Sequence, residues 1–288
     1  MLCPAFLLTA VLCYLPLVGW WLAFTDYHVG DSLFGGDFVG LRQFSRLLFE
    51  SSDLGYLIRN TLVINGLTIV INITVALVLS VLLRELLWKP GAKFVQTILF
   101  FPYFISWVIM YSIVWALFAV NSGAINQLLV SLGVIEKGFN ILGSAKYSWG
   151  LMIVLNLFKH TGYNCIIFLA TISGIPQEQY ESASLDGAGR FAKIWYITLP
   201  NLIPTASILL IMNSGWIFSN NLELFFVFTN ATNWETMEVL DMYIYKFGLQ
   251  QLDYPYATAV GILKTLVSII VLVVVNKTVK KLSDTSVF

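Results

Sequence analysis

Polar and aromatic side chains recur at regular spacing inside long apolar stretches of this chain. In one stretch, Asn156, Lys159 and Tyr163 follow each other at helical spacing and would share roughly one face of a helix. Such residues are costly in lipid, so they usually face protein or a water-filled path. Amides can exchange hydrogen bonds with the hydroxyl groups of a solute, and aromatic rings can pack on its C–H faces. These residue types therefore indicate a polar pathway inside a membrane.

Three such faces can be placed on three apolar stretches. We expect the pathway to be lined by Trp107, Tyr111 and Trp115, by Asn156, Lys159 and Tyr163, and by Asn213, Trp216 and Asn220. A second interpretation stays open at each position. Tryptophan and tyrosine near the ends of spans often form interfacial belts, and asparagine often bridges neighbouring helices.

Two lysines and one histidine inside apolar stretches need separate interpretations. Lys159 lies deep in its stretch and should be paired with a carboxylate or a backbone carbonyl, or act as the counter-charge of an acidic solute. Lys264 lies two turns into the last stretch, and we expect it to snorkel outward. His160 is expected to form a hydrogen bond between helices rather than to bind a metal, because its one companion, His28, lies in a distant connector.

The sequence shows no arrangement typical of catalysis. It contains no Ser/His/Asp or Cys/His constellation, and its three cysteines have neither metal nor disulfide spacing. It also lacks a Gly-Lys pair, so it has no phosphate-binding loop for ATP. The net charge is zero and the basic residues are scattered, which argues against nucleic-acid binding. We therefore expect no catalytic residue, metal or cofactor on this chain.

Composition assigns the chain to membrane proteins. Of its residues 58% are hydrophobic and 11% are charged, against roughly 25% charged in soluble domains. The sequence predicts a single all-α domain over residues 1–288. The first span has no basic leader and no clear cleavage site, so we expect it to remain as a membrane anchor rather than to be removed as a signal peptide. Apolar runs near the length that spans a bilayer predict six spans at about 4–24, 57–83, 94–120, 147–175, 202–219 and 257–275.

Positive charge predicts the orientation of these spans. Six spans place both termini on one side of the membrane. The side with the termini, the 84–93 loop and residues 176–200 carries eight lysines and arginines against five acidic residues, and the opposite side carries six against eleven. Because basic residues favour the cytoplasm, we expect both termini and the 176–200 segment to be cytoplasmic.

The segment 181–200, ESASLDGAGRFAKIWYITLP, is a polar island between two apolar runs. Pro176 can begin a helix, since its missing N–H would be unsatisfied there in any case. Gly187 and Gly189 can end that helix. A second helix over residues 190–198 is expected to stop before Pro200, which disfavours helix in the preceding residue. The island therefore predicts two short helices and a turn at a membrane surface.

The island resembles the EAA motif of bacterial ABC importer permeases. That motif is Glu-Ala-Ala, three residues, Gly, nine residues, Ile, one residue, Leu-Pro. Every spacing is met, and one serine replaces the first alanine; the matching residues are Glu181, Ser182, Ala183, Gly187, Ile197, Leu199 and Pro200. The position between the fourth and fifth spans also matches. The longer text YESASLDGAGRFAKIWYITLP looks like the carbohydrate branch that includes the maltose permeases, and most resembles its oligosaccharide subgroup.

The resemblance implies a six-span type I ABC importer permease and a set of partners. The partners would be a second, homologous permease, two cytoplasmic ATP-binding subunits that carry ATP and Mg²⁺, an extracellular or periplasmic solute-binding protein, an oligosaccharide and membrane lipid. The segment 180–188 would be the coupling helix that docks on the ATPase, with Gly187 at its turn. The implied coupling residues are Glu181, Ser182, Ala183, Leu185, Asp186, Gly187, Ala188 and Phe191.

Three alternatives remain beside this interpretation. Within the same class, the solute could be another polar molecule such as glycerol phosphate. In a different class, the chain could be a non-transporting scaffold in the membrane that uses the island to recruit a cytoplasmic partner. The island itself could be an amphipathic loop that rests on lipid.

Overall fold

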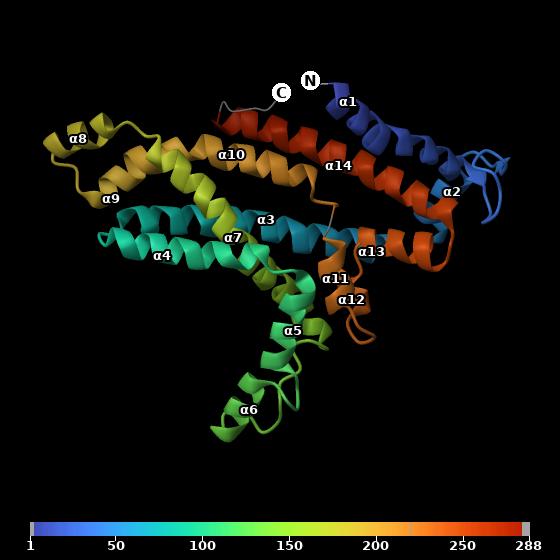
Figure 1. The fold of residues 1–288 in the computed structure, drawn as a ribbon, viewed down its shortest axis with the longest axis horizontal. Coiled ribbons are helices and arrows are strands. Elements are labelled where there is room, and N and C mark those ends of the chain that lie inside the picture. Colours follow the sequence, from blue (N-terminus) through green and yellow to red (C-terminus); the bar gives the residue numbers. More distant parts are fainter. Residues whose placement is uncertain (1–2, 220, 284–288) are drawn as a thin grey trace.

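The computed structural model describes residues 3–219 and 221–283, and these form one elongated bundle of helices with a projecting arm (Figure 1). Two antiparallel two-residue strands, β1 and β2, pair in the first connector, with Thr25 opposite Phe38. Short 3-10 or π-helical segments are labelled η. In chain order the elements are α1 (Cys3–Thr9), η1 (Ala10–Tyr14), η2 (Leu15–Phe24), β1 (Thr25–Asp26), β2 (Asp37–Phe38), α2 (Arg42–Ser45), η3 (Arg46–Glu50), α3 (Leu54–Glu85), α4 (Lys89–Phe100), η4 (Phe101–Phe104), α5 (Trp107–Phe118), α6 (Ala124–Ser131), α7 (Ala145–Ser173), α8 (Gln177–Leu185), α9 (Arg190–Lys193), η5 (Ile194–Thr198), α10 (Leu199–Gly215), α11 (Leu222–Phe228), α12 (Trp234–Met237), α13 (Leu240–Tyr245), η6 (Lys246–Gln250) and α14 (Tyr254–Ser283).

Within the described residues, five helices are long and apolar enough to cross a membrane. A sixth candidate is a bent pair of helices, Lys89–Phe104 and Trp107–Phe118. The chain is therefore nearly all-helical with five to six membrane-span candidates, as the apolar runs predict. The five straight candidates are Cys3–Phe24, Leu54–Glu85, Ala145–Ser173, Arg190–Gly215 and Tyr254–Lys281.

The third predicted span, 94–120, is not one straight helix. The chain bends by 106° between the two halves of the pair, and α5 and α6 project from the bundle as an arm (Figure 1). Pro102 lies in the 3-10 turn η4, Ile105 is extended, and Ser106 caps the new helix by accepting a bond from the Ile109 N–H at 3.4 Å. Proline and an N-cap serine both favour a break here, although the apolar run continues through it.

The second helix of the motif island continues further than expected. Residues 190–198 do not end before Pro200, because α9, η5 and α10 form one continuous span that begins at Arg190. The wide π-helical turn Ile194–Thr198 directly precedes α10, and the proline is the second residue of α10. A π-turn already displaces the regular backbone bonds, so the missing N–H of a proline is tolerated there.

Helix α3 contributes residues to each of the three largest apolar clusters among the described residues. Leu57 packs at the N-terminal end of α3 with Tyr243 and Tyr256, and Ile64 packs in the middle cluster with residues of α5, α7 and α11. Ala76 packs near the motif end with residues of α7 and α10. One continuous helix thus packs in the apolar clusters at both ends and in the middle of the bundle.

Buried polar contacts fasten the connector between α10 and α14 onto the N-terminal end of α3. The Asn60 amide donates to the backbone carbonyls of Glu235 and Glu238 at 2.8 and 3.0 Å, and the Tyr56 hydroxyl donates to the Glu238 carboxylate at 2.6 Å. Nearby, burial and a hydrogen bond with Tyr256 raise the pKa of Tyr243 above its usual range, so this phenol stays protonated.

The prediction that Lys264 snorkels outward is wrong. Its ammonium group forms an ion pair with Asp241 of α13, and both side chains are only 16% exposed. The lysine therefore ties α14 to the connector that precedes it. The carboxylate lies 23 residues earlier in the chain, in a segment whose position the sequence alone does not reveal.

Gly162 allows α4 to pass against α7 with backbone touching backbone. A β-carbon built at this position would lie 1.9 Å from the Leu99 carbonyl oxygen, which is far inside van der Waals contact. Gly150 lies on the same helix, and a β-carbon there meets nothing within 4 Å.

This difference gives a matched pair of substitutions. Gly162→Ala should destabilise the purified chain by about 1–3 kcal/mol, because a packed backbone must move to admit the methyl group. Gly150→Ala should leave stability unchanged or raise it by up to about 1 kcal/mol, as alanine is the better helix former. Thermal unfolding in detergent measures both, and equal melting temperatures for the two variants would contradict the close contact.

Candidate functional site

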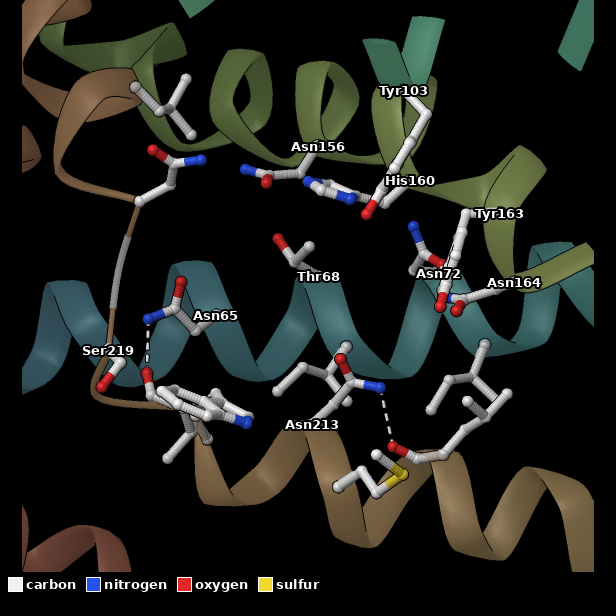
Figure 2. A pocket seen from close by; sticks show the side chains of 18 of the residues that line it. Asn65, Thr68, Asn72, Tyr103, Asn156, His160, Tyr163, Asn164, Asn213 and Ser219 are labelled. Carbon is white, nitrogen blue, oxygen red and sulfur yellow. Dashed lines mark hydrogen bonds between the residues drawn. The ribbon is translucent and has the colours of Figure 1, made fainter. Parts of the chain in front are cut away.

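A cavity of about 500 Å³ lies between α3, α7 and α10 (Figure 2). Its wall mixes amides, hydroxyls and rings with apolar side chains, and none of the described residues that line it is Asp, Glu, Lys or Arg. This composition suits a solute rich in hydroxyl groups, because amides and hydroxyls can exchange hydrogen bonds with it. The polar and aromatic lining residues are Asn65, Thr68, Asn72, Tyr103, Asn156, His160, Tyr163, Asn164, Asn213, Trp216, Ser219, Asn221 and Phe225.

The amides in the wall are held in place by the protein. The Asn164 amide donates to the Asn72 carbonyl oxygen at 2.6 Å, which joins α7 to α3 at the cavity. Asn156 and Asn213 each donate one N–H to the carbonyl four residues earlier, at 2.9 and 2.7 Å. A primary amide has two donors and two acceptor lone pairs. Fixed in this way, each amide retains capacity to bind a solute in a defined direction.

Thr68 lies in the middle of the α3 wall and points toward the cavity (Figure 2). Its hydroxyl oxygen is buried and has no hydrogen-bond partner among the described residues. Thr74, further along the same helix, instead donates to the Val70 carbonyl at 2.8 Å. An unsatisfied buried hydroxyl is costly, so its presence at a cavity wall is consistent with a partner that arrives from outside the chain.

Two stacked tyrosines form the aromatic part of the wall. The rings of Tyr103 and Tyr163 lie 4.9 Å apart and nearly parallel, at 14°. His160 meets Tyr103 edge-on at 5.8 Å. Trp216, on the opposite wall, is 71% exposed and offers an open ring face. Such rings can pack against the C–H faces of a sugar while the amides bind its hydroxyls.

The structure brings some of the predicted pathway residues together and separates others. Asn156, Tyr163, Asn213 and Trp216 all line the cavity, whereas Trp107, Tyr111, Trp115 and Lys159 are not among its lining residues. Trp107 is buried in the middle core, Tyr111 packs edge-on against Phe228, and Trp115 is half exposed on the arm. Asn220 lies outside the described residues. Contact of any of these side chains with a solute stays a prediction.

Lys159 is bound to backbone carbonyls, which was one of the expected arrangements. Its ammonium group donates to the Tyr103 carbonyl at 3.1 Å and to the Ile105 carbonyl, and it lies 5.1 Å from the centre of the Trp107 ring. Its side chain is buried, with the residue 8% exposed. Neighbouring His160 lines the cavity, and no cluster of potential metal ligands occurs in the described parts of the chain.

The α3 wall was not predicted. Asn65, Thr68 and Asn72 lie at positions i, i+3 and i+7, the same helical spacing that identified the face on α7. The signal was therefore present in the second apolar run. Tyr103 carried no comparable signal, because it reaches the cavity only through the break in the third span.

The motif island forms a projecting corner at one end of the bundle (Figure 1). Helix α8 covers Gln177–Leu185, three residues earlier than the expected 180–188. Gly187 has φ +79°, which glycine adopts without strain. Ala188 N–H donates to the Ala183 carbonyl at 2.8 Å and Gly187 N–H to the Ser184 carbonyl at 3.1 Å. This is the Schellman pattern that closes a helix, and it confirms the turn at Gly187.

The corner presents apolar side chains outward while polar contacts hold it to the bundle. Leu185 and Phe191 are 90% and 87% exposed, and Glu181, Ser182 and Asp186 are exposed as well. Arg190 forms an ion pair with Glu85 at the end of α3, at 2.9 Å, and the Tyr180 and Thr198 hydroxyls lie 3.0 Å apart. Large apolar groups at a polar, projecting corner indicate a contact with another molecule.

The unpaired Thr68 hydroxyl predicts an unusual response to substitution. Thr68→Val keeps the shape of the side chain and removes the buried polar atom, so it should raise the stability of the purified chain by about 1 kcal/mol. Thr74→Val removes a hydroxyl that is already bonded and should give no gain. Thermal unfolding in detergent compares them, and a loss of stability in the Thr68 variant would show that its hydroxyl is satisfied.

Known proteins resemble this chain over its whole length. Residues 73–283 match the family model described as the binding-protein-dependent transport system inner membrane component. The polygalacturonan/rhamnogalacturonan transport system permease protein YteP of Bacillus subtilis is 35% identical over 288 residues, covering 100% of this chain and 89% of the relative. Protein LplB of the same organism is 34% identical and is covered to 90%.

A solved structure agrees with these relatives. A chain of a bacterial alginate ABC transporter, in complex with an alginate pentasaccharide-bound periplasmic protein, superposes with a TM-score of 0.90 at 31% identity, covering 100% of this chain and 95% of that one. The projecting corner, the membrane spans and the sequence likeness thus agree with one another, and this chain belongs to the family of inner membrane components of binding-protein-dependent transport systems.

Proposed function

We propose that this chain is the permease subunit of an ATP-driven importer that moves an oligosaccharide across the cell membrane. The observation that carries the proposal is the cavity between α3, α7 and α10, with fixed amides, an unpaired hydroxyl and stacked tyrosines. Its volume of about 500 Å³ falls in the range of ordinary ligand sites. The names of YteP and of the alginate transporter support a saccharide.

The pathway is completed by a second, homologous permease. Met212 and Trp216 line the cavity and are 59% and 71% exposed, so this wall of the cavity is open in the single chain. A solute-binding protein outside the membrane delivers the sugar. The alginate relative, solved with a saccharide-bound periplasmic protein, supports that partner.

The force comes from two ATP-binding subunits, which carry ATP and Mg²⁺ and dock on the α8 corner in the cytoplasm. Leu185 and Phe191 supply the contact, and the corner passes the motion to the spans. The α3–α4 turn, the α8 corner and the end of α14 all lie toward one end of the bundle (Figure 1). The basic residues of these segments favour the cytoplasmic side for that end and for both termini.

The cavity favours a sugar over glycerol phosphate. A phosphate group is normally met by cationic side chains, and none of the described residues that line the cavity is lysine or arginine. A non-transporting scaffold would need the α8 corner but would have no use for a polar cavity within the membrane, where polar residues are costly.

Uptake measurements test the proposal. Membrane vesicles with the assembled complex should import at least one labelled tetrasaccharide from a panel of oligogalacturonate, alginate and arabinan fragments, and should not import sn-glycerol 3-phosphate. Asn156→Ala should lower uptake about three- to tenfold, because one bond to the sugar is lost. Asn201→Ala is the control. The Asn201 amide also donates to the carbonyl four residues earlier, at 2.8 Å, but the residue is exposed and is not among those that line the cavity. Uptake of glycerol phosphate alone would contradict the proposal.

The docking role of the corner has its own test. Leu185→Asp should release the ATPase subunits from the detergent-solubilised complex and retain the second permease, because it places a charge in a largely apolar contact. The fold should be unaffected, since Leu185 is 90% exposed. Phe49→Asp is the control, as Phe49 is 84% exposed in η3 at the other end of the bundle. Full retention of the ATPase by the Leu185 variant would exclude this docking site.

A further inference from the structure

We propose that Lys159 is a positioning residue: it holds the break in the third span so that Tyr103 keeps its ring in the wall of the cavity. The effect on uptake rests on the proposed function, whereas the effect on the position of Tyr103 does not. The inference gives a role to the one lysine that is buried within α7 and paired with no carboxylate in the described residues.

The first observation is that Lys159 satisfies the broken backbone. Between η4 and α5 the backbone hydrogen bonds of the helix are interrupted, and the Ile109 N–H donates to the Ser106 hydroxyl instead. The ammonium group of Lys159 donates to the carbonyl of Tyr103, in the turn before the break, and to that of Ile105, within the break. Irregular backbone at membrane depth persists only where such groups are satisfied by protein or water. One side chain here provides two of the missing donors.

The second observation is that Gly162 brings the break within reach of the lysine. It lies three residues after Lys159, on the same face of α7. Without a side chain, it lets the Leu99 carbonyl come so close that a β-carbon would be 1.9 Å away. Gly162 and Lys159 together form the contact site on α7 for the end of α4, hereafter the seat. Gly162 allows the close approach of the backbone, and Lys159 supplies the hydrogen-bond donors.

The third observation links this seat to the cavity. Tyr103 accepts the bond from Lys159 through its carbonyl, and its ring lines the cavity, stacked on Tyr163 at 4.9 Å. The same ammonium group lies 5.1 Å from the centre of the Trp107 ring, on the other side of the break. Lys159 therefore fixes residues on both sides of the bend, and one of them is part of the wall.

These contacts also weigh against Lys159 as the counter-charge of an acidic sugar. The residue is 8% exposed and is not among those that line the cavity. Its ammonium group is turned toward the two carbonyls. A counter-charge would have to leave both carbonyls, and would then leave them unsatisfied inside the membrane.

A thiol cross-link tests the position of Tyr103 without any transport. Cys3, Cys13 and Cys165 are first replaced by alanine, and Tyr103→Cys and Tyr163→Cys are introduced into the full complex. A short bifunctional thiol reagent should join the two positions readily. Lys159→Met should slow the reaction about fivefold or more, as expected for loss of hydrogen bonds from a charged donor. Lys159→Arg, which keeps a cationic donor, should react faster than Lys159→Met. Equal rates with Lys159 and with methionine would overturn the inference.

A double-mutant cycle on uptake distinguishes positioning from an independent role. With the tetrasaccharide that wild-type vesicles import, Lys159→Met should raise KM about fivefold or more at equal protein in the membrane. In a Tyr103→Leu background, the same change should raise KM less than about twofold. Lys146→Met, at the start of α7 and away from the break, is the control.

The outcomes of the cycle remain distinct from failure of the proposed function. If Lys159→Met and Tyr103→Leu raise KM by factors that simply multiply in the double variant, Lys159 acts independently of Tyr103, as a counter-charge would. That result would overturn the inference. A change in protein amount alone, with KM unaltered, would overturn it as well. If wild-type vesicles import no tetrasaccharide while the cross-link depends on Lys159, the proposed function fails and the positioning role stands.

Discussion

The packing of α3 against α7 is the contact on which the rest of the molecule depends. Along it, Asn164 bonds Asn72 and the Asn72 amide reaches the Thr161 hydroxyl, so the two helices are joined by polar groups as well as by close packing. In lipid there is little hydrophobic drive for helices to associate, and such contacts fix their register. The same faces that join the helices form two walls of the cavity. A change in register would therefore alter the shape of the site and the fastening of both ends of the bundle together.

The two lysines inside the spans show that a buried charge can be accommodated in different ways. Lys264 pairs with a carboxylate from a segment outside the spans, which ties the last span to the connector that precedes it. Lys159 meets the carbonyls of a broken helix. A carboxylate neutralises charge, whereas carbonyls offer only partial charges and leave a net positive centre near the middle of the bundle. The first arrangement serves attachment and the second serves local shape.

The sequence predicted most of the architecture, because hydropathy and motif spacing are local properties. Five spans and the turn at Gly187 follow from them. The break in the third span was missed because residues 94–120 are apolar throughout, and hydropathy does not register that Pro102 and Ser106 interrupt the helix. The π-turn before Pro200 and the partner of Lys264 depend on tertiary contacts. The α3 wall was different. Asn65, Thr68 and Asn72 have the helical spacing of a polar face, but the apolar run that contains them was used only to predict the length of a span.

The fastening of α3 to the connector between α10 and α14 also has a consequence for biosynthesis. Asn60 emerges from the ribosome early, yet the carbonyls that receive its amide belong to residues 175 and 178 positions later in the chain. Until Glu235 and Glu238 have been made, the early helix enters the membrane with a polar group that lacks its final partner. Contacts so distant along a chain form slowly, and an incompletely translated chain leaves this amide open. The N-terminal end of the second span therefore acquires its final polar contacts only when the connector before the last span has been translated.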